Sequence, residues 1–222
     1  CEGVLNMSIL NGIEVLCHSS IRINKDVTIY VDPYKVNKDY NDADYVFCTH
    51  EHYDHFSPED IKKIIKKDTV IITVQNTLQE SMKIQPDRSK IILVGPNESY
   101  DMKNIKFETT VAYNENKLFH QKSKKWVGYI ITLKNERYYI SGDTDDLPEL
   151  ENVKCDVAFV PVGGTYTMNY REAANLVNNI HPKIAIPTHY GLIVGSKEDA
   201  EKFKKNVLSD IRVEFATNYF NN

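Results

Sequence analysis

The sequence lacks a hydrophobic run long enough to span a bilayer, a signal-peptide pattern and an excess of basic residues. It has 27 Lys and Arg against 31 Asp and Glu, a formal net charge of -4. A membrane-spanning helix needs about 20 consecutive apolar residues, and nucleic-acid-binding domains usually carry a basic face. We therefore expect a protein that partners neither a membrane nor a nucleic acid. Nothing in the sequence predicts an oligomeric state.

Cysteine is also scarce, and no two cysteines form a CxxC pair. The four are Cys1, Cys17, Cys48 and Cys155. This spacing argues against a thiolate zinc site and fits a reduced, cytoplasmic protein. If Cys1 is a native mature N-terminus, an exported lipoprotein is the alternative.

The 222 residues suffice for one domain or a tight pair of half-domains, and we predict a single domain over residues 1–222. Short β-rich runs come first in each half, and strands alternate with helices later. Strands are predicted at residues 14–17, 21–23, 27–31, 44–49, 69–74, 91–94, 105–113, 127–133, 137–141, 155–162, 183–188 and 212–217.

The helices are predicted mainly from their first residues. Ser57 and Pro58 favour a helix start, and Ile61, Ile64 and Ile65 give it an apolar stripe. Further helices are expected at residues 75–83, 169–179 and 196–205, the last two capped by asparagine and serine. The pattern predicts an α/β protein with two mixed sheets packed face to face and helices outside.

The stretch THEHYDH holds three of the seven histidines within six residues: His50, His52 and His55. Imidazole and carboxylate ligands suit zinc and other divalent metals. On an extended backbone His50 and His52 point the same way, whereas the adjacent Asp54 and His55 diverge. Such an arrangement could serve two metals joined by a bridging carboxylate. A polar surface loop is the alternative interpretation.

Three more candidate metal ligands lie just beyond the ends of predicted strands. Asp143 follows residues 137–141, His189 follows residues 183–188, and His120 lies in the segment after residues 105–113. Loops at strand ends are common places for ligand sites, because they are free of ladder hydrogen bonds. Asp143 is the carboxylate that could bridge two metals.

The ordered motifs HxHxDH (50–55), SGDTD (141–145) and PTHYG (187–191) resemble those of the metallo-β-lactamase superfamily. PVGGTYTMNYREAANLV and CHSSIRI look closer to a branch of small metal-dependent hydrolases related to ascorbate-phosphate lactonase. The resemblance covers nearly the whole chain. It implies a four-layer αβ/βα sandwich and one or two metals, usually zinc and sometimes manganese.

The resemblance implies a set of metal ligands when the family's ligand positions are carried over to this sequence. His50 and His52 would hold the first metal, Asp54, His55 and His189 the second, and Asp143 would bridge. The family often places a third histidine where this chain has Tyr113 and Asn114. His120 is the only histidine between His55 and His181, so we assign it there and predict that residues 114–125 fold back to deliver it.

Other residues have two interpretations each. His18 is either a satisfied histidine at a sheet edge or a group near the metal pocket. Gly164 and Thr165 either form a plain turn or present backbone N–H groups to an anionic substrate. Lys122, Lys124 and Lys125 could attract an anionic group, although lysine runs are usually solvated. Trp126 either roofs the pocket or packs in the core.

These observations predict a metal-dependent hydrolase in which a metal-bound hydroxide attacks an ester, lactone or phosphodiester. Asp54 would orient the nucleophile as well as bind metal. The expected partner is a small-molecule substrate that can be anionic. The alternative is a non-catalytic metal-binding or regulatory protein on the same scaffold.

Overall fold

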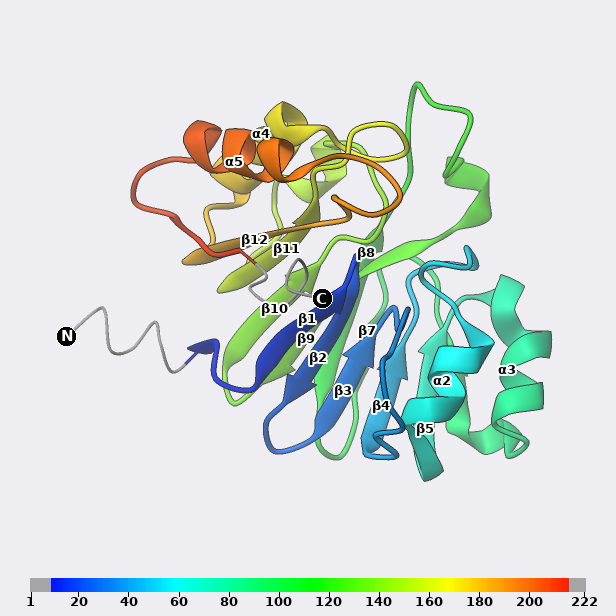
Figure 1. Cartoon of the computed structure of the whole chain (residues 1–222). Helices are drawn as coiled ribbons and strands as arrows, with labels where there is room; N and C mark the ends of the chain where they lie inside the picture. Colours follow the sequence, from blue (N-terminus) through cyan, green and yellow to red (C-terminus); the bar gives the residue numbers. More distant parts are fainter. Residues whose placement is uncertain (1–8, 216–222) are drawn as a thin grey trace. The chain divides into compact units, whose positions relative to one another are not determined.

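A computed structural model describes residues 9–215, so Cys1 and the last two residues of the strand predicted at 212–217 lie outside the described residues. The chain forms two compact units that divide between Val94 and Gly95. Each unit has its own β-sheet (Figure 1).

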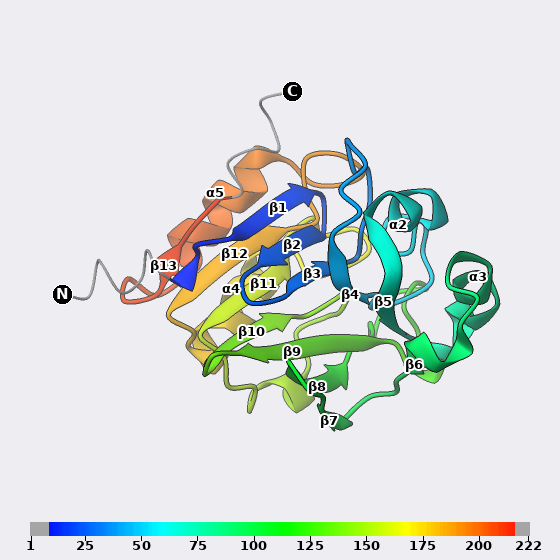
Figure 2. The same cartoon turned by 90° about the horizontal axis from the view of Figure 1, so that it is seen from below.

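Unit 1 contains a six-stranded sheet in which the strands follow their order in the sequence. The first three strands are antiparallel, and the next three continue the sheet in parallel. Figure 2 shows β1, β2 and β3 side by side. The strands are β1 (Ile13–Cys17), β2 (Ser20–Asn24), β3 (Thr28–Val31), β4 (Ala43–Phe47), β5 (Ile65–Thr73) and β6 (Ile91–Leu93).

The helices of unit 1 are α2 (Pro58–Ile64) and α3 (Leu78–Ile84), with short 3-10 turns η1 (Gln75–Thr77) and η2 (Arg88–Lys90). Ser57 caps α2 as predicted, because its hydroxyl accepts from the Asp60 N–H at 3.3 Å. The predicted apolar stripe is one residue too long. Ile65 has an extended backbone and begins β5, so it belongs to the strand that follows the helix.

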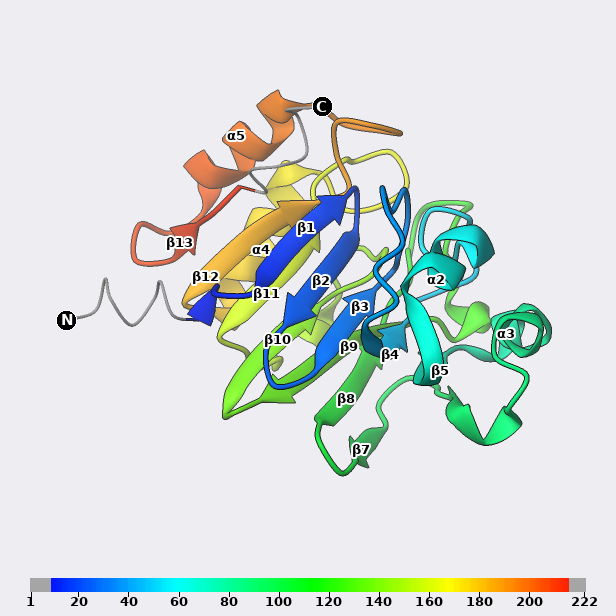
Figure 3. The ribbon, with the colours of Figure 1, turned by 60° about the horizontal axis from the view of Figure 1, so that its bottom comes forward.

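Unit 2 contains a seven-stranded sheet in the order β13-β12-β11-β10-β9-β8-β7. Strands β7 to β10 pair antiparallel, and β10 to β13 pair in parallel. Figure 3 shows β12, β11 and β10 in succession. The strands are β7 (Ser99–Asp101), β8 (Lys106–Val111), β9 (Val127–Leu133), β10 (Glu136–Ile140), β11 (Val157–Pro161), β12 (Ile184–Thr188) and β13 (Arg212–Val213).

Two longer helices, α4 (Tyr170–Ile180) and α5 (Lys197–Asn206), lie beside each other in unit 2 (Figure 1). Asn169 caps α4, and the Glu172 carboxylate accepts a hydrogen bond from the Asn169 N–H at 2.8 Å. Ser196 begins α5 with a similar contact to Asp199. Short 3-10 turns, η3 (Lys122–Lys124) and η4 (Pro148–Leu150), complete the unit.

The prediction of an α/β protein with two mixed sheets is confirmed. Each sheet has parallel strands, and the carboxyl ends of parallel strands share one edge of their sheet. In unit 1, Asp32 directly follows β3 and the histidine cluster follows β4. In unit 2, Asp143 follows β10 and His189 follows β12. Parallel pairing therefore gathers the candidate ligands of each unit at one edge.

Within residues 9–215, no helix is long and apolar enough to cross a membrane. Cys17, Cys48 and Cys155 form no disulfide with one another, and burial raises the pKa of the Cys48 thiol well above its ordinary value. The cytoplasmic location expected from the cysteines stays a prediction.

Candidate functional site

The histidine cluster of unit 1 forms a tight turn between β4 and α2. The N–H groups of His55 and Phe56 both donate to the carbonyl oxygen of His52, at 2.9 and 2.8 Å. The turn begins where β4 ends and stops where Ser57 caps α2. The cluster is thus fixed at both ends by regular structure.

His50 and His52 lie together, as their spacing predicts. His50 Nε2 is 3.1 Å from His52 Nδ1, and the ring centroids are 4.7 Å apart. The Thr49 hydroxyl lies 2.9 Å from His50 Nδ1. His50 is buried and His52 is half-buried. Thr49 therefore contacts one ring nitrogen of His50 and leaves the other nitrogen facing His52.

Asp54 and His55 do not diverge as predicted. His55 Nε2 lies 3.6 Å from Asp54 Oδ2, and His18 Nε2 lies 3.4 Å from the same oxygen. Divergence assumes an extended backbone, but the hydrogen bonds to His52 make this segment a turn. His18 comes from the turn between β1 and β2 and is only 1% exposed. It is a buried neighbour of Asp54.

Asp32 is a site residue that the sequence analysis missed. Its Oδ2 lies 2.7 Å from His55 Nδ1, and its carboxylate accepts hydrogen bonds from the Thr49 N–H and hydroxyl, both at 2.8 Å. Burial raises the pKa of Asp32, while His55 and the hydrogen bonds from Thr49 oppose that rise. An ionised carboxylate can only accept, so an ionised Asp32 requires the proton on His55 Nδ1 and the lone pair on Nε2.

Unit 2 brings together His120, Asp143 and His189. Asp143 Oδ2 lies 3.1 Å from His120 Nε2 and 3.2 Å from His189 Nε2. All three residues are buried, with exposed fractions of 4%, 3% and 1%. One carboxylate oxygen therefore lies between two imidazole nitrogens.

The segment after β8 folds back on itself, whereas delivery of His120 to the metal of His50 and His52 stays a prediction. The Asn114 N–H donates to the His120 carbonyl at 2.8 Å, and the Asn114 side-chain amide donates to the carbonyls of Phe119 and Tyr166 at 3.1 and 2.7 Å. These bonds close the loop and hold His120 inside unit 2. Trp126 is buried against the His120 ring, with centroids 5.3 Å apart.

Four of these residues have left-handed backbone conformations without being glycine. The φ angles are 54° at His18, 47° at Asp32, 57° at His120 and 55° at His189. Non-glycine residues rarely adopt this region, and such strain concentrates at functional sites. The geometry of each unit therefore holds these side chains in strained backbone positions.

The two donor sets fit a divalent first-row metal. Two donors on a tetrahedral zinc with bonds of about 2.0–2.1 Å lie roughly 3.3 Å apart. The nitrogen–oxygen separations around Asp54 and Asp143 are 3.1–3.6 Å. Buried imidazoles beside buried carboxylates are also the ligand chemistry that zinc and manganese accept.

Gly163, Gly164 and Thr165 form a turn whose N–H groups are used internally. Gly164 N–H donates to the Met168 carbonyl and Thr165 N–H to the Gly163 carbonyl, at 3.1 and 3.2 Å. A β-carbon on Gly163 would lie 2.3 Å from the His189 carbonyl oxygen. Gly163 therefore permits close approach of the loop that carries His189.

Comparison with known families gives an independent result. The protein-family model described as "Beta-lactamase superfamily domain" matches residues 12–189 of this chain. That span includes candidate ligands of both units.

Related sequences and solved structures agree with this match. A UPF0173 protein from Pyrococcus abyssi is 31% identical over 187 residues, covering 82% of this chain and 83% of the relative. A UPF0173 metal-dependent hydrolase from Thermoplasma acidophilum is 28% identical over 187 residues, covering 79% and 81%. A crystal structure of a protein assigned as a metal-dependent hydrolase, from Parabacteroides distasonis, has 33% identity and a TM-score of 0.77 over 91% of each chain.

A metallo-β-lactamase fold protein from Bacillus subtilis matches with a TM-score of 0.72 over 94% of each chain. Its sequence identity is 12%, so it supports the fold alone.

Proposed function

The chain belongs to the β-lactamase superfamily and is a metal-dependent hydrolase of that superfamily, and from this premise we propose that histidines and aspartates of its sequence motifs are the ligands of its metal centre. The family match runs from residue 12 to residue 189, which supports the prediction of a single hydrolase domain over residues 1–222. The proposed ligands are His50, His52, Asp54, His55, His120, Asp143 and His189.

The division of ligands follows the family pattern. His50, His52 and His120 would hold one metal, and Asp54, His55 and His189 a second. Asp143 would bridge them. The observation that carries this proposal is the position of Asp143 Oδ2, within 3.2 Å of both His120 Nε2 and His189 Nε2. One or two zinc ions suit these ligands, and manganese is the second choice.

A bound divalent metal supplies a Lewis acid that lowers the pKa of a water molecule and polarises a substrate oxygen. Asp54 would orient the attacking water and accept its proton. His18, at 3.4 Å from the Asp54 carboxylate, would hold that carboxylate in place. Asp32 would keep the proton on His55 Nδ1 and the lone pair on Nε2.

We propose that the substrate is a small ester, lactone or phosphodiester that can carry an anionic group. Each of these has a carbonyl or phosphorus centre open to attack by an activated water. No covalent protein intermediate is required in this scheme.

Metal content and hydrolysis test the proposal together. We expect one to two zinc ions per chain after reconstitution, and hydrolysis within a panel of simple esters, lactones and phosphodiesters that a chelator abolishes. Asp143→Asn should lose most of the metal and the activity. His181→Gln is the matched control, because His181 lies on the surface and pairs with Asp210 at 3.0 Å.

A wild-type chain that binds no metal would contradict the proposed ligands. Stoichiometric metal without hydrolysis of any panel member would instead support the non-catalytic alternative.

A further inference from the structure

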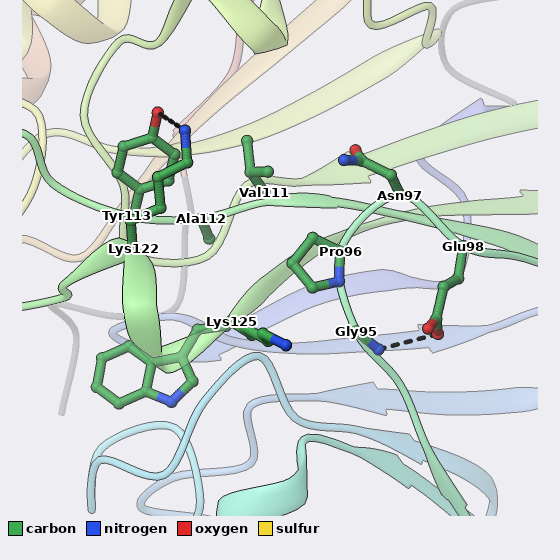
Figure 4. A pocket seen from close by; sticks show the side chains of 10 residues that line it. Gly95, Pro96, Asn97, Glu98, Val111, Ala112, Tyr113, Lys122 and Lys125 are labelled. Carbon is green, nitrogen blue, oxygen red and sulfur yellow. Dashed lines mark hydrogen bonds between the residues drawn. The ribbon is translucent and has the colours of Figure 1, made fainter.

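A cavity of about 530 Å³ opens in unit 2 at the end of β8 (Figure 4). Its lining comes from three segments, residues 95–98, 111–113 and 122–126. None of the seven proposed metal ligands lines it. Pockets of about 300–1,000 Å³ are typical of small-molecule sites, so its size suits a ligand with one ring.

The lining of the cavity combines polar side chains with rings and aliphatic groups. Pro96, Tyr113 and Trp126 contribute ring surfaces, and Val111 and Ala112 contribute aliphatic groups. Figure 4 shows Pro96 between the segment that carries Tyr113 and the turn that carries Glu98. A flat apolar body can therefore be enclosed by rings from separate segments.

Two of the charged groups of the cavity are already engaged. Lys122 Nζ donates to the Tyr113 hydroxyl and to the Glu149 carboxylate, both at 3.0 Å. Glu98 accepts from the Gly95 N–H at 2.9 Å and from the Tyr100 hydroxyl at 2.6 Å. Neither group offers its full charge to a ligand.

Lys125 differs from these groups. The structure records no ion pair for its ammonium among residues 9–215, and Figure 4 shows its side chain extending toward Gly95 and Pro96. Its φ of 55° is in the left-handed region, which a lysine rarely adopts. The cavity thus presents one cation that forms no ion pair with any residue the structure describes.

We propose that this cavity binds a small organic acid, with its carboxylate on the Lys125 ammonium and its flat apolar body against Pro96 and Trp126. A single available cation matches a monoanion better than a dianion such as a phosphate monoester. An ammonium–carboxylate hydrogen bond is stronger than one between neutral groups, so the charge gives this site its selectivity. Trp126 also contacts the His120 ring, which places the bound acid one side chain away from a proposed metal ligand.

Trp126 is the only tryptophan of the chain, so its fluorescence reports directly on the cavity. Titration of the full chain with benzoate should give a saturable change in that fluorescence. Benzamide, which has the same shape without the charge, should bind at least tenfold more weakly. Inorganic phosphate should also bind at least tenfold more weakly, because it lacks the flat body.

Substitutions at Lys125 identify the cation. Lys125→Gln should weaken benzoate binding at least tenfold, whereas Lys125→Arg should stay within threefold of wild type. Lys125→Gly removes the charge and relieves the strained φ, so it should remain folded and also lose benzoate. Lys103→Gln removes an exposed lysine of the same unit outside the cavity and should change nothing.

Three results would overturn the proposal. They are the absence of a saturable change with benzoate, equal binding of benzamide and benzoate, and unchanged benzoate binding in both Lys125→Gln and Lys125→Gly. None of these depends on catalytic turnover.

Discussion

Replacing Asp32 by asparagine should weaken zinc binding without removing a metal ligand. In the native chain Asp32 Oδ2 lies 2.7 Å from His55 Nδ1, and the same carboxylate accepts two hydrogen bonds from Thr49. Asparagine keeps the size of the side chain and can still accept from the Thr49 N–H. Its amide nitrogen would then face His55 Nδ1.

That amide nitrogen can only donate, so His55 Nδ1 would have to accept. The proton of a neutral imidazole would move to Nε2, the nitrogen that faces Asp54. A protonated Nε2 cannot bind a metal. Loss of such an orienting carboxylate typically lowers metal affinity 10- to 100-fold, which corresponds to about 1.4–2.8 kcal/mol.

The assay is a zinc titration in competition with a chelator of known affinity, on wild type and variant. Asp60→Asn is the matched control. Asp60 is also a buried aspartate, and it accepts hydrogen bonds from the Lys35 and Val36 N–H groups at 2.8 and 3.0 Å. It should lose stability to urea but keep the zinc affinity of the wild type.

Zinc affinity of Asp32→Asn within twofold of wild type would refute this reasoning. The same would follow if Asp60→Asn lost as much zinc affinity as Asp32→Asn, because the effect would then be one of general stability.

Three further predictions concern stability and the position of His189. Burial alone would raise the pKa of Asp60, but its hydrogen bonds lower that pKa overall. The ionised carboxylate therefore stabilises the fold above the unfolded pKa of about 3.9, and this stabilisation is lost as pH falls through the folded pKa. The urea midpoint of the wild type should drop below pH 4, and it should drop less in Asp60→Asn. Asn169→Ala should cost about 1 kcal/mol of unfolding free energy, measured by urea unfolding; no loss would contradict the capping role. Gly163→Ala should weaken zinc binding, because its new β-carbon would lie 2.3 Å from the His189 carbonyl oxygen. Gly164→Ala is the control: its β-carbon has its nearest contact at 3.5 Å, so this variant should lower stability only. Equal zinc affinities in the two variants would count against this account.

Much of the fold can be predicted from local patterns. Runs rich in Val, Ile and Tyr became strands, and Ser57 and Asn169 began helices because their side chains satisfy free N–H groups of the first turn. The end of α2 was harder to place. Ile65 continues the helical apolar stripe, but pairing with Ala43 on β4 gives it an extended backbone.

Asp32 shows what local patterns do not contain. Its contacts to Thr49 and His55 depend on parallel pairing of β3 with β4, between segments 17 and 23 residues apart. An acid at the end of a predicted strand is the only sequence signal, and Asp143 has a similar one. The partner of such an acid can be identified only once the strand order is known.

The left-handed residues of the site have a consequence for engineering. His18, Asp32, His120 and His189 each occupy a backbone region that costs a non-glycine residue about 1 kcal/mol or more. Glycine at any of these positions would relieve that cost and remove the functional side chain at once. Selection of variants for heat resistance alone would therefore enrich for proteins that have lost these side chains, and any thermostability campaign on this chain needs a parallel selection for metal retention.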